Sequence, residues 1–132
     1  MLRFMLDTNI CIYVIKNRPE VVRERFNRHS GTLCISSVTL AELHYGVMKS
    51  ARPEHNLQIV ESFAARLSVL DFDPVAAGHY GDIRVDLERR GTVIGPYDMM
   101  IAGHARSRGL TLVTNNLKEF ERVKGLLTDN WI

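Results

Sequence analysis

Cysteine, long apolar runs and net charge are all scarce in this sequence. The two cysteines, Cys11 and Cys34, each lie inside an apolar stretch and form no Cys-x-x-Cys pair, which excludes the common zinc and redox motifs. No stretch approaches the roughly 18 apolar residues that a membrane-spanning helix needs. Seventeen basic residues against 15 acidic ones leave a net charge of only +2. Domains that bind nucleic acid through net charge alone are much more basic.

The composition is that of one folded domain. With 45% apolar and 24% charged residues, the chain combines a high apolar content with a low net charge, which excludes intrinsic disorder. A chain of 132 residues buries enough surface to fold without disulfides, so we expect a single domain over residues 1–132. The apolar start is interrupted at Arg3 and stops at Asp7, unlike a signal peptide, and we therefore expect a cytoplasmic protein without membrane attachment.

Short apolar segments alternate with longer amphipathic ones along the whole sequence. This alternation predicts an α/β fold with a mostly parallel central sheet flanked by helices. Such sheets bind ligands beyond the carboxyl ends of their strands, near a switch in strand order. Strands are expected at residues 2–6, 32–36, 68–72, 110–114 and, at an edge, 126–127. Helices are expected at 10–16, 19–30, 37–49 (capped by Ser37), 53–67, 74–90, 95–108 and about 118–120.

Three carboxylates lie near the places where such a sheet would bind a ligand. Asp7 directly follows the first strand, and Glu42 lies one turn into the helix after the second strand. Asp98 shares a helical face with Ile101 and Ala102, where an unpaired carboxylate is costly to bury. Taken singly, each has an ordinary explanation: a turn residue for Asp7, a solvated residue for Glu42 and a favourable charge at a helix N-terminus for Asp98.

As a set, the acids point to a divalent cation. Asn116 follows the strand at 110–114, and Glu119 lies in the short polar helix beyond it, where a solvated surface position is the ordinary alternative. Carboxylates gathered at the strand ends of one small domain repel one another unless a cation lies among them. All-oxygen ligands suit hard ions such as Mg²⁺ or Mn²⁺, and Mg²⁺ commonly recruits phosphate oxygens. The pattern therefore indicates phosphodiester chemistry.

Four segments of the sequence form a recognisable pattern. They are Met5-Leu-Asp-Thr-Asn-Ile10, Ser36-Ser-Val-Thr-Leu-Ala-Glu-Leu-His-Tyr-Gly46, Gly95-Pro-Tyr-Asp-Met-Met-Ile-Ala-Gly-His104 and Leu112-Val-Thr-Asn-Asn-Leu-Lys-Glu-Phe120. Each alone is weak, but four in this order over a chain of this length are specific. The sequence resembles, from Met1 to Trp131, the VapC family of PIN-domain ribonuclease toxins from bacterial toxin–antitoxin pairs.

This resemblance implies a PIN fold and a metal-dependent endoribonuclease that uses Mg²⁺, with Mn²⁺ as a substitute. By position, Asp7, Glu42 and Asp98 match the family's core acidic residues. Asp7 and Asp98 are the implied direct ligands, and Glu42 completes the set directly or through water. Many PIN nucleases carry a further acid where this sequence has Asn116, an amide that adds a carbonyl ligand but no charge. Supporting roles are implied for Thr8 and Asn9 beside Asp7, for Thr114 toward a water or phosphate, and for Glu119 through water.

The resemblance also implies a substrate and partners. The family targets structured RNAs needed for translation, and its members most similar to this sequence act on the anticodon region of initiator tRNA. The expected substrate is therefore tRNA, and the expected outcome is inhibited translation. The expected partners are a cognate antitoxin that blocks the site, a second toxin copy in a homodimer within a larger assembly, and operator DNA bound only through the antitoxin. The apolar helices around Ile10–Ile15 and Leu57–Leu67 are candidate interfaces.

The basic residues are candidates for holding RNA phosphates. Setting aside the four acids named above leaves 11 acidic residues against 17 basic ones, a net charge of +6. This predicts an acidic pocket within a basic surround. His44 and His104 lie close in sequence to proposed ligands, and either contact RNA or support the site from behind. The basic residues are densest at Arg84, Arg89, Arg90, Arg106 and Arg108.

Two other classes of protein remain open. One is a phosphoacceptor signalling domain, which needs adjacent acids after the first strand and a lysine after the last, whereas Thr8 and Asn9 follow Asp7 and no lysine directly follows Thr114. The other is a non-catalytic PIN-like scaffold, which gains nothing from mutually repelling acids. Nucleotide-binding glycine motifs and the serine-hydrolase elbow are absent.

Overall fold

The computed structural model describes all 132 residues as an α/β domain. Its five strands are β1 (Phe4–Leu6), β2 (Leu33–Ser36), β3 (Ser68–Leu70), β4 (Thr111–Val113) and β5 (Leu127–Asp129). They form one sheet in the order β3-β2-β1-β4-β5, and every neighbouring pair is parallel. The predicted mostly parallel sheet is confirmed, and the expected edge strand at 126–127 is β5, which starts one residue later and ends two residues later.

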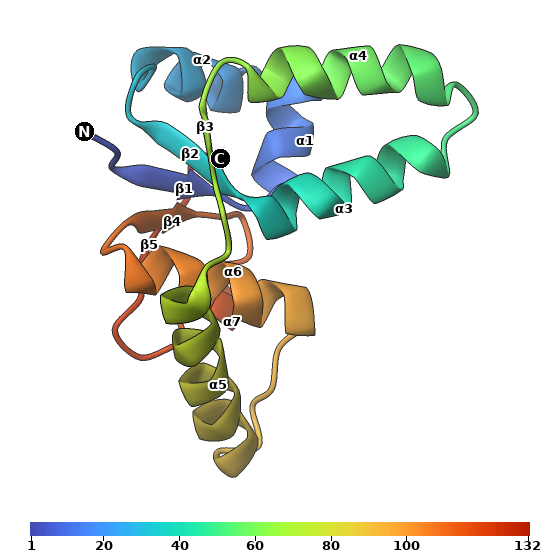
Figure 1. The fold of residues 1–132 in the computed structure, drawn as a ribbon. Coiled ribbons are helices and arrows are strands. Elements are labelled where there is room, and N and C mark those ends of the chain that lie inside the picture. The colour runs from blue at the N-terminus through green and yellow to red at the C-terminus, as the bar shows by residue number, and fades with distance from the viewer.

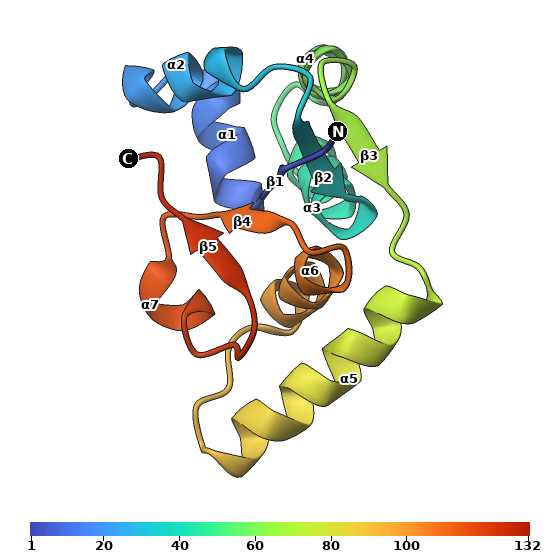
Figure 2. The same cartoon turned by 90° about the vertical axis from the view of Figure 1, so that its left-hand side faces the viewer.

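Seven helices connect and cover the strands. They are α1 (Thr8–Lys16), α2 (Glu20–Arg28), α3 (Ser37–Met48), α4 (Pro53–Ala64), α5 (Pro74–Arg89), α6 (Pro96–Ser107) and α7 (Leu117–Phe120). Helices α1 to α4 lie on one side of the sheet, and α5 to α7 lie on the other (Figure 1, Figure 2). None of them combines the length and apolarity needed to cross a bilayer.

Strand β1 separates two apolar clusters. Phe4 and Leu6 point into a cluster formed mainly with α1 to α4, whereas Met5 points into a second cluster formed with α5 and α6. This is the alternation of side chains expected along a strand that is buried on both faces. Cys11 and Cys34 are buried free thiols, one in each cluster, as the sequence predicts.

Several predicted boundaries differ from the structure by one to three residues, and two of the differences lie where a serine hydroxyl accepts from a backbone N–H. The third strand was expected to reach residue 72, but it ends at Leu70, and the Phe72 N–H instead donates to Ser37 Oγ at 3.0 Å. The cap of α3 is Ser36 and not Ser37, because Ser36 Oγ accepts from the Val38 N–H at 3.1 Å. A residue that ends a strand thus also starts the next helix.

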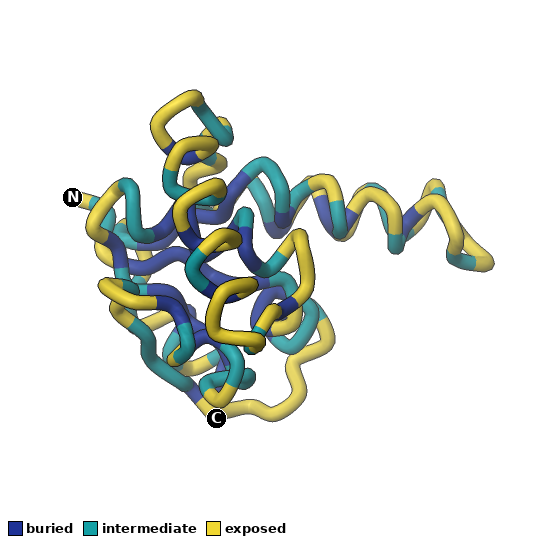
Figure 3. Tube along the Cα trace, turned by 90° about the horizontal axis from the view of Figure 1, so that it is seen from below, coloured by how far each residue is buried: buried dark blue, intermediate teal, exposed yellow.

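The strand order places a switch point at the centre of the sheet. From β1 the chain moves through β2 to β3 on one side, and β4 and β5 lie on the other side. Ligands of open parallel sheets bind at such a point, beyond the carboxyl ends of the strands. Helices α3 and α4 form a hairpin that projects from the body, and its tip is exposed (Figure 3).

Candidate active site

Asp7 lies at the switch point, at the carboxyl end of β1. Its N–H donates to the carbonyl of Val113 at the end of β4, at 3.0 Å. Its side chain caps α1 by accepting from the Ile10 N–H at 2.9 Å. The residue is only 5% exposed. The carboxylate is therefore held in place by one strand, one helix and their junction.

Glu42 comes to the same edge from α3. Its Oε1 accepts a 2.6 Å hydrogen bond from Thr8 Oγ1, the residue directly after Asp7. This bond joins the start of α1 to the second turn of α3. It fixes a long, half-buried side chain that would otherwise have several rotamers.

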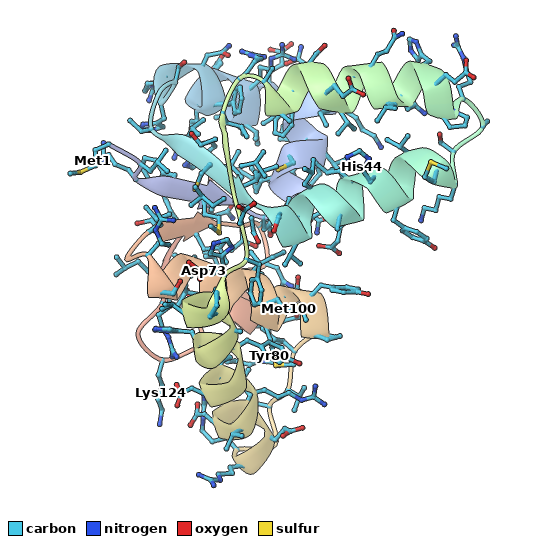
Figure 4. The ribbon with its side chains drawn as sticks, in the orientation of Figure 1. Met1, His44, Asp73, Tyr80, Met100 and Lys124 are labelled. Atoms are coloured by element: carbon cyan, nitrogen blue, oxygen red, sulfur yellow. The ribbon has the colours of Figure 1, made fainter.

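Asp98 comes from the other side of the sheet, as the third residue of α6. A Cβ on Gly95 would lie 3.4 Å from Asp98 Oδ2, so the residue that caps α6 lies directly beside the carboxylate. Figure 4 labels Met100, two residues later, at the end of α6 that lies below α3. The two acid-bearing helices therefore approach each other at this edge.

The acids interact electrostatically. Burial, together with the negative charges of Glu42, Asp7 and Glu119, raises the pKa of Asp98 from 3.8 to about 6. The pKa of Asp7 is also raised, chiefly by burial, although hydrogen bonds from the Thr114 side chain and the Ile10 N–H oppose this. Glu42 adds to the increase for Asp7. The fold therefore brings Glu42, Asp7 and Glu119 within electrostatic range of Asp98, and the role of these acids as one site stays a prediction.

No cationic side chain neutralises this acidic cluster. The salt bridges of the protein all lie among residues 82–124 and involve none of the four acids. No three of the chain's histidine, cysteine, aspartate and glutamate side chains stand close enough to form a metal site by themselves. The donors are all oxygens and carry uncompensated charge, so they fit a hard divalent ion that keeps several water ligands.

The predicted supporting residues differ in how they reach the cluster. Thr114 is buried at the end of β4, and its Oγ1 accepts from the Asn116 N–H at 2.9 Å. Asn116 is half-buried at the start of α7 with no side-chain capping bond. Asn9 is exposed, and only its backbone acts on Asp7, whose pKa it lowers by hydrogen bonding. Asn115 instead donates to the Tyr13 hydroxyl at 2.9 Å.

The two histidines named from the sequence are placed differently. His44 is exposed on α3, two residues after Glu42. His104 is completely buried, and its Nδ1 lies 2.8 Å from Ser36 Oγ. Of the two roles considered for His104, contact with RNA is therefore excluded. Ser36 was not singled out from the sequence, because a serine at the end of a strand has many ordinary roles.

The basic residues considered for RNA binding are largely engaged with acids. Arg106 contacts Asp82 at 2.7 Å, and this arginine also donates to His79. Two more arginines of the set are paired along α5, and Arg89 and Arg108 are exposed. The pairs along α5 are Arg84 with Glu88 at 3.4 Å and Arg90 with Asp86 at 2.6 Å. The paired arginines are thus less available to phosphates than the sequence suggested.

Comparison with known proteins gives a consistent family. The sequence model described as PIN domain matches residues 4–126. The chain is 63% identical over 131 residues to the "tRNA(fMet)-specific endonuclease VapC" of Shigella flexneri, covering 99% of each chain. The structure of DNA-bound VapBC from Salmonella typhimurium superposes with a TM-score of 0.96, 61% identity and full coverage of both chains. The structure of VapBC2 from Rickettsia felis, bound to a promoter DNA fragment, superposes with a TM-score of 0.93 and 41% sequence identity. The match covers 99% of this chain and 100% of that one.

Proposed function

The chain belongs to the PIN-domain family, among the VapC ribonucleases of toxin–antitoxin systems, and we propose that it cleaves RNA at Asp7, Glu42 and Asp98 with a divalent cation. The observation that carries this proposal is the acidic cluster without a cationic partner. A signalling domain that accepts a phosphoryl group on aspartate is set aside, because the match to the PIN family covers residues 4–126. A scaffold without activity would gain nothing from these mutually repelling acids.

The chain's own residues position the reacting groups. Asp7 is fixed by its capping bond, and Thr8 orients the carboxylate of Glu42. Asp98, on α6, lies within range of the charges of both. Together they would hold Mg²⁺ or Mn²⁺, with Asn116 and Glu119 contributing through an amide oxygen or water. When bound, the ion supplies positive charge at the scissile phosphate and favours deprotonation of the attacking water. In-line attack by that water leaves a 5′-phosphate and a 3′-hydroxyl.

We propose tRNA as the substrate, and initiator tRNA in its anticodon region in particular. The relative in Shigella flexneri is named for activity on tRNA(fMet), and it shares 63% of its residues with this chain. Folded loops offer unstacked bases and an accessible backbone, which suit a compact nuclease. Cleavage there would inhibit translation. The protein would then act in the cytoplasm, where translation takes place. Sequencing RNA ends from expressing cells tests this, because cuts scattered over many mRNAs would contradict a tRNA target.

We propose that a cognate antitoxin binds along α4. A groove of about 460 Å³ lies between α1, α3 and α4 and reaches Glu42, so a partner lying in it also reaches the acidic cluster. A second groove, of about 370 Å³, lies between α1, α2 and α4. A cationic side chain from the antitoxin would block the site by replacing the charge of the metal. Solved relatives are VapBC assemblies bound to DNA, which supports an antitoxin partner and an assembly on DNA. From the family resemblance we further propose a toxin homodimer and contact with operator DNA only through the antitoxin.

The activity is tested with purified protein and RNA. We expect cleavage with Mg²⁺ or Mn²⁺ and none with EDTA. Asp7→Asn and Asp98→Asn should each lower the rate by roughly 100-fold or more, because each removes a charge that the transition state needs. Asparagine caps a helix as well as aspartate, so Asp7→Asn keeps α1 intact. Cleavage by both variants at the parent rate would contradict the proposed site.

A further inference from the structure

Glu42 and Asp98 lie on two helices that their charges push apart. Helix α3 carries Glu42 and α6 carries Asp98, and the negative charge of Glu42 helps to raise the pKa of Asp98. Yet a divalent ion requires its ligands at a definite separation. Some contact must therefore hold the two helices together against this repulsion.

A single side-chain hydrogen bond joins α6 to the β2–α3 junction, between His104 Nδ1 and Ser36 Oγ at 2.8 Å. Both residues are fully buried. Ser36 also caps α3 through the Val38 N–H, so it holds the start of that helix. The bond thus links the N-cap of α3 to the last turn of α6.

The bond lies at equal distances along the chain from the two acids. Ser36 precedes Glu42 by six positions, and Asp98 precedes His104 by six. Six helical residues span about 9 Å. A tilt of roughly 10° about this bond would therefore move either carboxylate by about 1.5 Å. A metal site tolerates much smaller displacements of its ligands.

The surroundings hold His104 firmly in place. A Cβ on Gly103 would lie 2.9 Å from the Tyr80 nitrogen, so α6 packs closely on α5 at the residue before the histidine. The ring of Phe72 packs edge-on against that of His104, with centroids 5.6 Å apart. The α5 helix and the segment before it therefore support the bond from the opposite side.

Apolar packing alone does not explain a histidine here. His104 Nε2 is buried without a hydrogen-bond partner, which costs stability. Burial also lowers the pKa of His104, so the ring is neutral at pH 7. A phenylalanine would fill the volume without an unpaired nitrogen. What the imidazole adds to packing is its bond to Ser36.

We propose that His104 is a positioning residue that, through Ser36, sets the separation of Glu42 and Asp98 for binding of a divalent cation. It touches neither substrate nor metal. This inference rests on the proposed function, because it needs the acidic cluster to bind an ion. It assigns to His104, a buried residue outside the acidic cluster, the role of keeping α3 and α6 at a fixed separation.

The test is the affinity of the full-length protein for Mn²⁺, measured by isothermal titration calorimetry without RNA, well below the melting temperature. We expect His104→Phe and Ser36→Ala each to weaken Mn²⁺ binding by roughly tenfold. His104→Asn can place a polar atom close to the original Nδ1, and Ser36→Thr keeps the hydroxyl, so both should stay near the parent affinity. The double variant His104→Phe/Ser36→Ala should bind no more weakly than the weaker single variant, because both remove the same bond.

The outcomes separate this inference from the proposed function. If the parent binds no Mn²⁺, the metal site itself is wrong, and this inference fails with it. If the parent binds Mn²⁺ and Asp98→Asn does not, but folded His104→Phe binds as the parent does, only this inference is overturned. Should His104→Phe not fold, Ser36→Ala decides, and an unchanged Mn²⁺ affinity there overturns the proposal. Failure of His104→Asn and Ser36→Thr to preserve binding would also overturn it.

Discussion

Thr8 and Glu42 are joined by a 2.6 Å hydrogen bond from Thr8 Oγ1 to Glu42 Oε1, across 34 positions of sequence. The bond links the residue after Asp7 to the helix that carries the second acid. Thr8, which follows Asp7, therefore positions the side chain of Glu42. It restricts the rotamers of Glu42 and holds that carboxylate beside the start of α1.

Removing the hydroxyl of Thr8 should slow RNA cleavage without unfolding the protein. Thr8→Val keeps the shape of the side chain but frees Glu42, and we expect the cleavage rate to fall roughly tenfold. The control is Thr8→Ser, which keeps the donor and should retain most of the activity. Rates on one defined RNA at fixed Mg²⁺ make the comparison, and parent-like cleavage by Thr8→Val would show that the bond is not needed.

Asp98 makes the stability of the metal-free protein depend on pH. Its folded-state pKa of about 6 lies above its usual value of 3.8. Between these two pH values, the folded protein keeps a proton on Asp98 that the unfolded chain has released. This contribution to stability is therefore largest below pH 3.8 and is lost as the pH rises toward 6 and beyond. Asp98→Asn should stabilise the protein at pH 7.5 by about 1–2 kcal/mol after allowance for solvent screening, and by much less near pH 4.

Urea unfolding in EDTA at the two pH values measures this difference. Val85→Asn on α5, far along the chain from the cluster, is the control for a surface change to asparagine and should show no such pH dependence. An equal effect of Asp98→Asn at both pH values would contradict the raised pKa of Asp98.

The sequence was sufficient to predict where the acids lie in the fold, but not which side chains form hydrogen bonds or ion pairs. Parallel strands end at one edge, so Asp7 after β1 marks that edge, and the charge of Asp7 contributes to the raised pKa of Asp98 on α6. The bond between His104 and Ser36 spans 68 positions and leaves no periodic signal. Likewise, the pairing of Arg106 with Asp82 depends on how α5 packs on α6. Local sequence patterns predict helices, strands and the edge where the strands end. Side-chain partners that are far apart in sequence can be identified only from the three-dimensional structure.

Asn116 offers a gain-of-charge test. The side chain lies half-buried at the start of α7 and makes no capping bond, so Asn116→Asp should be tolerated. An added carboxylate should tighten Mn²⁺ binding roughly tenfold and, through repulsion, lower the melting temperature in EDTA. Titration calorimetry and thermal unfolding with and without Mn²⁺ measure both effects. Glu119→Gln removes a nearby charge, so it should weaken Mn²⁺ binding and raise the melting temperature in EDTA. An unchanged Mn²⁺ affinity in Asn116→Asp would place residue 116 outside the metal site.

Binding of the antitoxin should depend on the grooves beside α4. Ile59 borders both grooves and is 37% exposed, so Ile59→Asp puts a charge where we expect an apolar partner surface. We expect this variant to lose co-purification with the antitoxin and to keep its ribonuclease activity. Val85→Asp, an exposed valine changed in the same way on α5, should still bind the antitoxin. Retained binding by Ile59→Asp would move the interface elsewhere.

The chemical groups at the cut ends distinguish metal-dependent hydrolysis by water from metal-free cleavage. Purified protein is incubated with initiator tRNA and Mg²⁺, and the termini of the fragments are identified by mass spectrometry. If Asp7, Glu42 and Asp98 hold a divalent cation and water is the nucleophile, the fragments carry a 5′-phosphate and a 3′-hydroxyl, and EDTA or Asp98→Asn abolishes them. Fragments with a 5′-hydroxyl and a 2′,3′-cyclic phosphate, formed equally in EDTA, would contradict the account.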